Sequence, residues 1–152
     1  ALIFARGNVI NFMLTRHDQE AMLTCVREHL AANGQFLFDV VEKPLSQFVT
    51  NVNETAWFTI QHSSGRHSVV SGTDQFDFAR QLWTQTCYER WDTPDGELIR
   101  PPWSLTLRYT MPQECESLLH YNGFRIVAKY ADYDGAPETA EQPASVYVCM
   151  KR

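Results

Sequence analysis

A strand–helix–strand unit in the first 41 residues is the feature that most constrains the fold. Residues 2–5 and 35–41 are two short apolar runs, typical of strands buried on both faces. Between them Thr15 can cap a helix with one apolar face, and Asn33-Gly34 ends it, with Gly34 expected in a left-handed conformation. A strand, a helix and a second strand form a parallel crossover, so the pattern predicts an α/β fold.

The C-terminal third also has a pattern of helix and strand signals. Residues 110–113 (Thr-Met-Pro-Gln) have the spacing of a capping box and an early proline, which predicts a helix that Asn122-Gly123 ends. Strands are expected over residues 124–130 and 145–150, joined by a long loop. This spacing suits an antiparallel pair.

The middle of the chain differs from both ends. Residues 44–109 are predicted to be an antiparallel insert, with strands over 57–60, 67–70, 76–91 and 105–109 and a hairpin turn at Asp95-Gly96. All four tryptophans lie within it. We expect this sheet to cover the strand ends of an open α/β sheet, where ligands bind.

Length, charge and composition argue against several classes of function. A length of 152 residues fits one domain, residues 1–152. The formal net charge of −5, without a basic run, argues against a nucleic-acid or membrane partner. Four separated cysteines favour reduced thiols and a cytoplasmic location, since no apolar run approaches a membrane span. The histidines lack the spacing of a metal site.

Four stretches in a fixed order resemble one known family. They are ALIFARGNVINFMLT at residues 1–15, LAANGQFLFD at 30–39, YNGF at 121–124 and YADYDG at 130–135. In this order they are similar to the C-terminal half of class I S-adenosylmethionine-dependent methyltransferases, from the fourth sheet strand to the seventh. The resemblance implies a partial Rossmann-like sheet of the last four strands, the final one antiparallel, with the inserted sheet as a substrate lid.

One departure from the family is large. These enzymes hold S-adenosylmethionine with a glycine-rich loop after the first strand and an acidic residue after the second, where backbone amides reach the ligand. The seven glycines of this chain are scattered, no two within five residues of each other. We therefore expect the cofactor to bind weakly or not at all to this chain alone, and an N-terminal half to be missing.

Five residues are candidate site residues. The resemblance implies that Arg6 and Gly7 contact the methionine part of the cofactor and that Asn8 contacts the substrate. Asp39 ends the second strand at the same edge, and Tyr133 could line the substrate mouth. Each has a plainer reading: a strand-ending turn for residues 6–8, a cap for Asp39 and a solvated acidic loop for Tyr133. No catalytic residue is identified.

Two further histidines, His62 and His67, flank a predicted hairpin tip, where either could act as a base.

Two functions follow from these patterns. The first is the C-terminal part of a methyltransferase acting on a small-molecule N- or O-nucleophile. The second is a non-catalytic binding or assembly module. In either case the apolar strand at residues 2–5 would leave an exposed edge, which a homodimer or a separate N-terminal half would cover.

Overall fold

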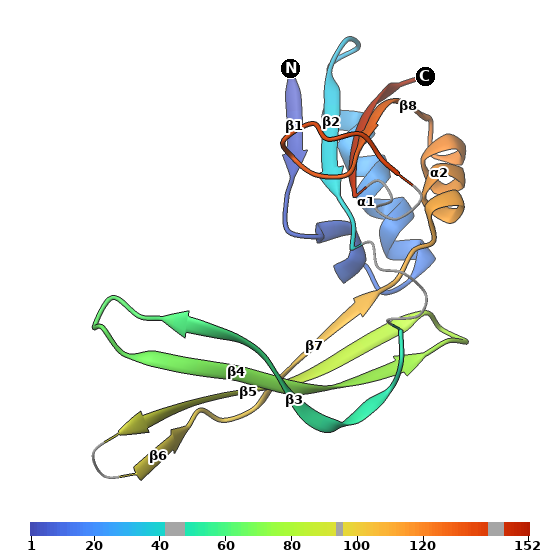
Figure 1. Ribbon diagram of the computed structural model, residues 1–152. Helices are drawn as coiled ribbons and strands as arrows, with labels where there is room; N and C mark the ends of the chain where they lie inside the picture. The colour runs from blue at the N-terminus through green and yellow to red at the C-terminus, as the bar shows by residue number, and fades with distance from the viewer. Residues whose placement is uncertain (42–47, 94–95, 140–144) are drawn as a thin grey trace. The chain divides into compact units, whose positions relative to one another are not determined.

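The computed structural model describes residues 1–41, 48–93, 96–139 and 145–152 (Figure 1). The chain divides into two compact units. Unit 1 comprises Ala1–Leu45 with Leu107–Arg152, and unit 2 is Ser46–Thr106. Each unit is described separately below. The insert of residues 44–109 was predicted as a lid, and that role stays a prediction.

Unit 1 contains a mixed sheet of four strands in the order β1-β2-β9-β8. Strand β1 runs parallel to β2, and β9 lies antiparallel to both of its neighbours. The predicted α/β class is confirmed, with a parallel first pair and an antiparallel last strand. The strands are β1 (Leu2–Ala5), β2 (Gln35–Asp39), β8 (Phe124–Tyr130) and β9 (Val146–Lys151).

Unit 1 also contains helical segments, and its first α-helix begins at a side-chain cap. A 3-10 helix, η1 (Val9–Phe12), precedes α1 (Arg16–His29), and α2 is Pro112–Tyr121. Thr15 caps α1 as predicted, because its hydroxyl accepts a hydrogen bond from the Asp18 amide at 3.2 Å.

The start of α2 differs from the prediction by one residue. Its N-cap is Met111, whose amide donates to the Glu114 carboxylate at 3.3 Å. Thr110 is buried, and its hydroxyl accepts instead from the Gln19 amide group at 3.3 Å. Because this tertiary contact takes the hydroxyl, the predicted box between Thr110 and Gln113 moves on by one position.

The core of unit 1 lies on one face of the sheet, under both helices. Ile3, Phe36, Cys149 and Ile126 stand in register across the four strands and belong to this core or pack against it. Leu23 of α1 and Cys115 and Leu119 of α2 complete it. These three helix residues are fully buried. Successive side chains of a strand point to opposite faces of the sheet, so the residues of one face pack against the helices.

Two details of the predicted crossover were wrong. Strand β1 has only one covered face, because Leu2 and Phe4 are 62% and 51% exposed, whereas its place at the edge of the sheet agrees with the expected exposed edge. Gly34 has no positive φ. A Cβ there would lie 2.8 Å from Leu30 Cδ1 and 3.0 Å from the Ala31 carbonyl oxygen, so close packing favours glycine at this position.

Unit 2 is built on an antiparallel sheet in the order β3-β4-β5-β6, and β7 also pairs with β5. The predicted single strand over 76–91 was wrong: a turn divides it, and the Asp77 carboxylate accepts from the Arg80 amide at 3.0 Å. Asp95 of the predicted hairpin turn lies outside the described residues. The strands are β3 (Asn51–Gln61), β4 (His67–Asp77), β5 (Leu82–Thr93), β6 (Gly96–Ile99) and β7 (Trp103–Arg108).

Candidate functional site

The carboxyl ends of β1 and β2 meet in a loop that Asp39 organises. Because the two strands are parallel, the residues after β1 reach the same edge of the sheet as the last residue of β2. One Asp39 oxygen accepts from the Gly7 amide at 3.0 Å, and the other accepts from the Asn8 amide at 2.7 Å. The carboxylate therefore binds two consecutive amides and fixes the loop after β1.

The backbone of this loop explains the residue types at two positions. Gly7 has φ 93°, and Asn8 has φ 60° with ψ 34°, the left-handed region that glycine and asparagine tolerate best. A Cβ at Gly7 would meet no atom within 4 Å. The positive φ of Gly7, and not crowding around it, therefore favours glycine at this position. The open space beside Gly7 leaves room for another group.

Tyr133 reaches the same edge from the loop after β8. The Arg6 guanidinium carbon lies 5.2 Å from the centre of its ring, and the Phe4 ring packs edge-on at 5.9 Å. Burial, and then a hydrogen bond with Asp39, raise the pKa of Tyr133 to about 12. Its hydroxyl therefore stays protonated at neutral pH and can donate to the Asp39 carboxylate.

The structure thus brings all five predicted site residues together: Arg6, Gly7, Asn8, Asp39 and Tyr133. These contacts join the five residues to one another, and Tyr133 also packs against Phe4. The binding roles assigned to them from the sequence stay predictions.

The residues at this edge are better suited to lie beside a bound cofactor than to anchor its carboxylate. A carboxylate of a bound ligand would need free backbone amides, and the Gly7 and Asn8 amides both donate to Asp39. The exposed Arg6 side chain and the open side of Gly7 are what this loop has left to offer.

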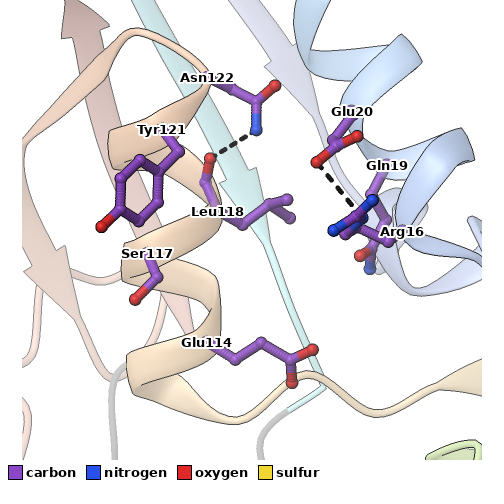
Figure 2. Close-up of a pocket in the computed structure, with 8 residues that line it drawn as sticks. All are labelled: Arg16, Gln19, Glu20, Glu114, Ser117, Leu118, Tyr121 and Asn122. Atoms are coloured by element: carbon purple, nitrogen blue, oxygen red, sulfur yellow. Dashed lines mark hydrogen bonds and ion pairs between the residues drawn. The ribbon is translucent and has the colours of Figure 1, made fainter.

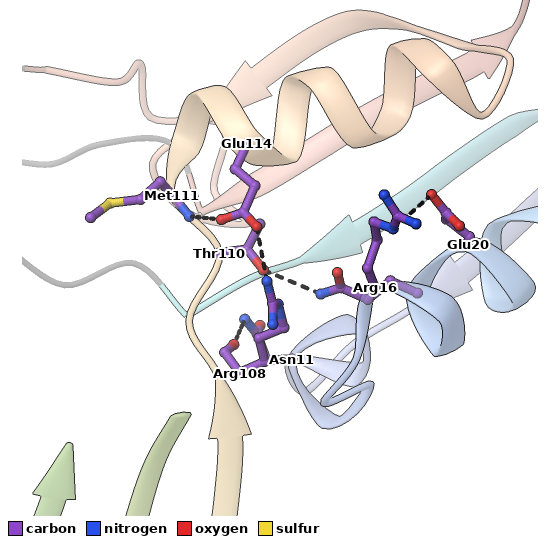
Figure 3. Close-up of polar contacts among 8 residues, drawn as sticks. Asn11, Arg16, Glu20, Arg108, Thr110, Met111 and Glu114 are labelled. Carbon is purple, nitrogen blue, oxygen red and sulfur yellow. Dashed lines mark hydrogen bonds and ion pairs between the residues drawn. The ribbon is translucent and has the colours of Figure 1, made fainter. Parts of the chain in front are cut away.

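Asn11 is a buried polar residue that sequence reasoning missed. Its side-chain amide donates to the Arg108 carbonyl oxygen at 2.7 Å (Figure 3). Its oxygen accepts from the Val41 amide at 3.0 Å. It is fully buried, so it ties η1 to two distant segments. The signal that could have revealed it is one asparagine inside the apolar run of residues 9–14.

A second feature of unit 1 lies between its helices. A pocket of about 310 Å³ lies between α1 and α2. It is lined by Arg16, Glu20, Glu114, Leu118 and other residues (Figure 2). Arg16 and Glu20 form an ion pair at 3.5 Å. Glu114 accepts from the Arg108 guanidinium at 3.0 Å. The charges that line it are thus paired, and sequence reasoning did not foresee this pocket.

The histidine candidates belong to unit 2. His62 Nε2 lies 2.8 Å from the Ser68 hydroxyl, which donates to the Glu89 carboxylate at 2.7 Å. His67 begins β4 and is exposed. A role as a base stays a prediction for both.

Within residues 1–41, 48–93, 96–139 and 145–152, no three His, Cys, Asp or Glu side chains are grouped so that they could hold a metal ion. Nor does the described part of the chain contain a helix with the length and apolar character that crossing a membrane requires.

Among the comparisons with known proteins, only the comparison with solved structures found matches. No protein-family model matches the sequence, and no curated protein matches it. Solved structures do match. A methyltransferase called CcbJ from Streptomyces caelestis has a TM-score of 0.82 at 19% identity, with 99% of this chain and 56% of that one covered.

Two further structures agree. An S-adenosylmethionine-dependent methyltransferase from Clostridium acetobutylicum has a TM-score of 0.79 at 17% identity, covering 99% of this chain and 57% of that one. The amino pentose methyltransferase CalS10 from Micromonospora echinaspora, solved with S-adenosylmethionine bound, has a TM-score of 0.74 at 12% identity, with coverages of 99% and 58%.

This chain therefore spans a little more than half the length of the structures that it matches. It has the fold of part of an S-adenosylmethionine-dependent methyltransferase, the C-terminal portion.

Proposed function

We propose that this chain is the C-terminal part of an S-adenosylmethionine-dependent methyltransferase that acts on a small-molecule N- or O-nucleophile in the cytoplasm. The observation that carries the proposal is the meeting of Arg6, Gly7, Asn8, Asp39 and Tyr133 at the carboxyl edge of the sheet. Ligands of open α/β sheets bind at this edge. An N-terminal part, in the same polypeptide or in a second chain, would supply the glycine-rich loop.

Each residue of this edge has a distinct part in the proposal. When bound, the cofactor supplies an electrophilic methyl group, and transfer then depends mainly on how the acceptor is positioned. Asp39 holds the loop, Asn8 orients the acceptor and Arg6 with Gly7 flanks the cofactor. Tyr133 presents a neutral ring and a hydroxyl that does not ionise near neutral pH.

The test compares this chain alone with an extended protein, in which an N-terminal part from the same reading frame or from a second chain is present. Calorimetry should show weak or no S-adenosylmethionine binding by residues 1–152 and clear binding by the extended protein. Radiolabelled methyl transfer to a panel of small amines and alcohols should need the extended protein. An extended protein that carries a glycine-rich strand–loop–helix and still fails to bind the cofactor would contradict the proposal.

A second candidate function rests on strand β1. It lies at the edge of its sheet with Leu2 and Phe4 exposed, which is a surface that favours pairing with another chain. In this alternative the chain is a binding or assembly module that dimerises along Leu2–Ala5. Sedimentation should then show a dimer that the double variant Leu2→Lys, Phe4→Lys converts to monomer. A wild-type chain that sediments as a monomer would exclude it.

A further inference from the structure

The ring of Tyr133 carries a cation on one face. The Arg6 guanidinium lies over it, with its central carbon 5.2 Å from the ring centre, and Phe4 fixes the ring edge-on from β1. Tyr133 is 40% exposed and Arg6 is exposed. Aromatic faces attract cations within about 6 Å, most strongly where water is partly excluded.

Two carboxylates lie near Tyr133. Asp39 lies at its hydroxyl, and Asp132 directly precedes it in the sequence. The loop is ordered by its own bonds: Asp132 accepts from the Tyr133 amide at 2.6 Å, and Asp134 accepts from the Ala136 amide at 2.8 Å. The arrangement is therefore an aromatic face among negative charges, which is suited to a positively charged group.

Arg6 can leave this face without disturbing the loop that carries it. The backbone after Arg6 is held by Asp39 through the amides of Gly7 and Asn8, so it does not depend on where the Arg6 side chain lies. A long and exposed guanidinium chain has several rotamers in water and costs little to displace.

We propose that the Tyr133 face binds a cationic ammonium group of the methyl acceptor, and that the Arg6 side chain occupies this face until the acceptor arrives. The inference rests on the proposed function and deepens it, because it selects acceptors that carry an ammonium group. An ammonium nitrogen has no lone pair, so it must release a proton to solvent before that nitrogen can take the methyl group. A neutral alcohol would lack the charge that the ring and the carboxylates recognise.

The test uses residues 1–152 with labelled tyrosine, n-butylammonium as the probe and n-butanol as its neutral match. The Tyr133 ring signals should shift saturably with the cation, with half-saturation on the order of hundreds of millimolar, as expected of a single exposed cation–π contact. n-Butanol should leave them unchanged. Tyr121, which is 85% exposed, is the internal control and should not move.

Variants separate the two parts of the proposal. Arg6→Ala should bind the cation on the order of 2–5-fold more tightly, since it frees the ring face. Tyr133→Leu should abolish binding, and Tyr133→Phe should retain it. Because neither variant has a tyrosine at position 133, binding is followed by the backbone amide signals of Gly7 and Asn8 in uniformly isotope-labelled protein, and far-UV circular dichroism checks that each variant is folded. No saturable shift, an equal shift with n-butanol or an unimproved affinity in Arg6→Ala would overturn the inference. None of these results depends on S-adenosylmethionine binding, so the proposed function is judged separately.

Discussion

Asp39 determines the conformation of the loop after β1, because its two oxygens accept from consecutive amides at 3.0 and 2.7 Å. Asp39→Ala leaves the Gly7 and Asn8 amides without their partner. We expect the free energy of unfolding of unit 1 to fall by about 2 kcal/mol, the usual cost of losing charged hydrogen bonds. Urea unfolding followed by the far-UV helix signal measures it. Asp39→Asn keeps one acceptor and should lose about half as much.

Asp134→Ala is the matched control. Asp134 is exposed, and its carboxylate accepts one local bond, from the Ala136 amide at 2.8 Å. Its removal should change the free energy of unfolding by less than about 0.5 kcal/mol, as is usual at a surface. Equal losses in Asp39→Ala and Asp134→Ala would show that Asp39 does not fix the loop.

At the residue scale, the order of the strands in the sequence predicted which residues meet at the strand ends. It could not predict contacts that depend on tertiary packing. Asp39 and Asn8 could be placed because parallel strands end at one edge of the sheet. Gly72 could not be interpreted: a Cβ there would lie 2.3 Å from the Trp57 ring, a contact between residues 15 positions apart in sequence. Asn11 was missed for the same reason, since both of its partners are distant.

Among the elements, β4 and β5 are joined by a buried polar contact that responds to pH. The Ser68 hydroxyl donates to the Glu89 carboxylate at 2.7 Å, and both residues are buried. This hydrogen bond, followed by those from Arg100 and the charge of His62, lowers the pKa of Glu89. The folded pKa lies below the unfolded value of about 4.3, so the stabilisation is present above that value and is lost as the pH falls through the folded pKa.

Unit 2 should therefore lose stability progressively as the pH falls below about 5. All four tryptophans lie in this unit, so their fluorescence during urea unfolding reports on it. The variant Glu89→Gln cannot ionise and should show a weaker dependence over this range. At pH 7, Ser68→Ala should cost about 1.5–3 kcal/mol, because Glu89 loses its hydroxyl donor. A wild-type midpoint that is as insensitive to pH as that of Glu89→Gln would contradict this account.

Elements with local signals were predicted well, and those set by tertiary contacts were not. Thr15 caps α1 through a residue three positions on, so the sequence alone locates the start of this helix. The division of the run over 76–91 depends on a turn at Asp77, inside a stretch with continuous strand character. The start of α2 moves to Met111 because Thr110 bonds to Gln19, a contact that spans 91 positions.

For the whole molecule, the division into two units predicts that unit 1 can fold without unit 2. Every residue of its buried cluster, from Ile10 to Cys149, lies in Ala1–Leu45 or Leu107–Arg152. Asn11 binds the Arg108 carbonyl and Gln19 binds Thr110, so the second segment is anchored where it begins. We expect a variant with residues 46–106 replaced by a flexible Gly/Ser linker of about ten residues to keep its fold.

This variant contains no tryptophan, and α1 and α2 give the far-UV signal by which its unfolding can be followed. A cooperative transition in urea is expected. Leu119 is fully buried in the core, so Leu119→Ala in the shortened chain should lower the free energy of unfolding by about 2–5 kcal/mol. A helical signal that melts without cooperativity, and that Leu119→Ala leaves unchanged, would mean that unit 1 needs the insert to form its core. In that case the insert would have to contribute to the packing of unit 1 as well as to any role over the strand ends.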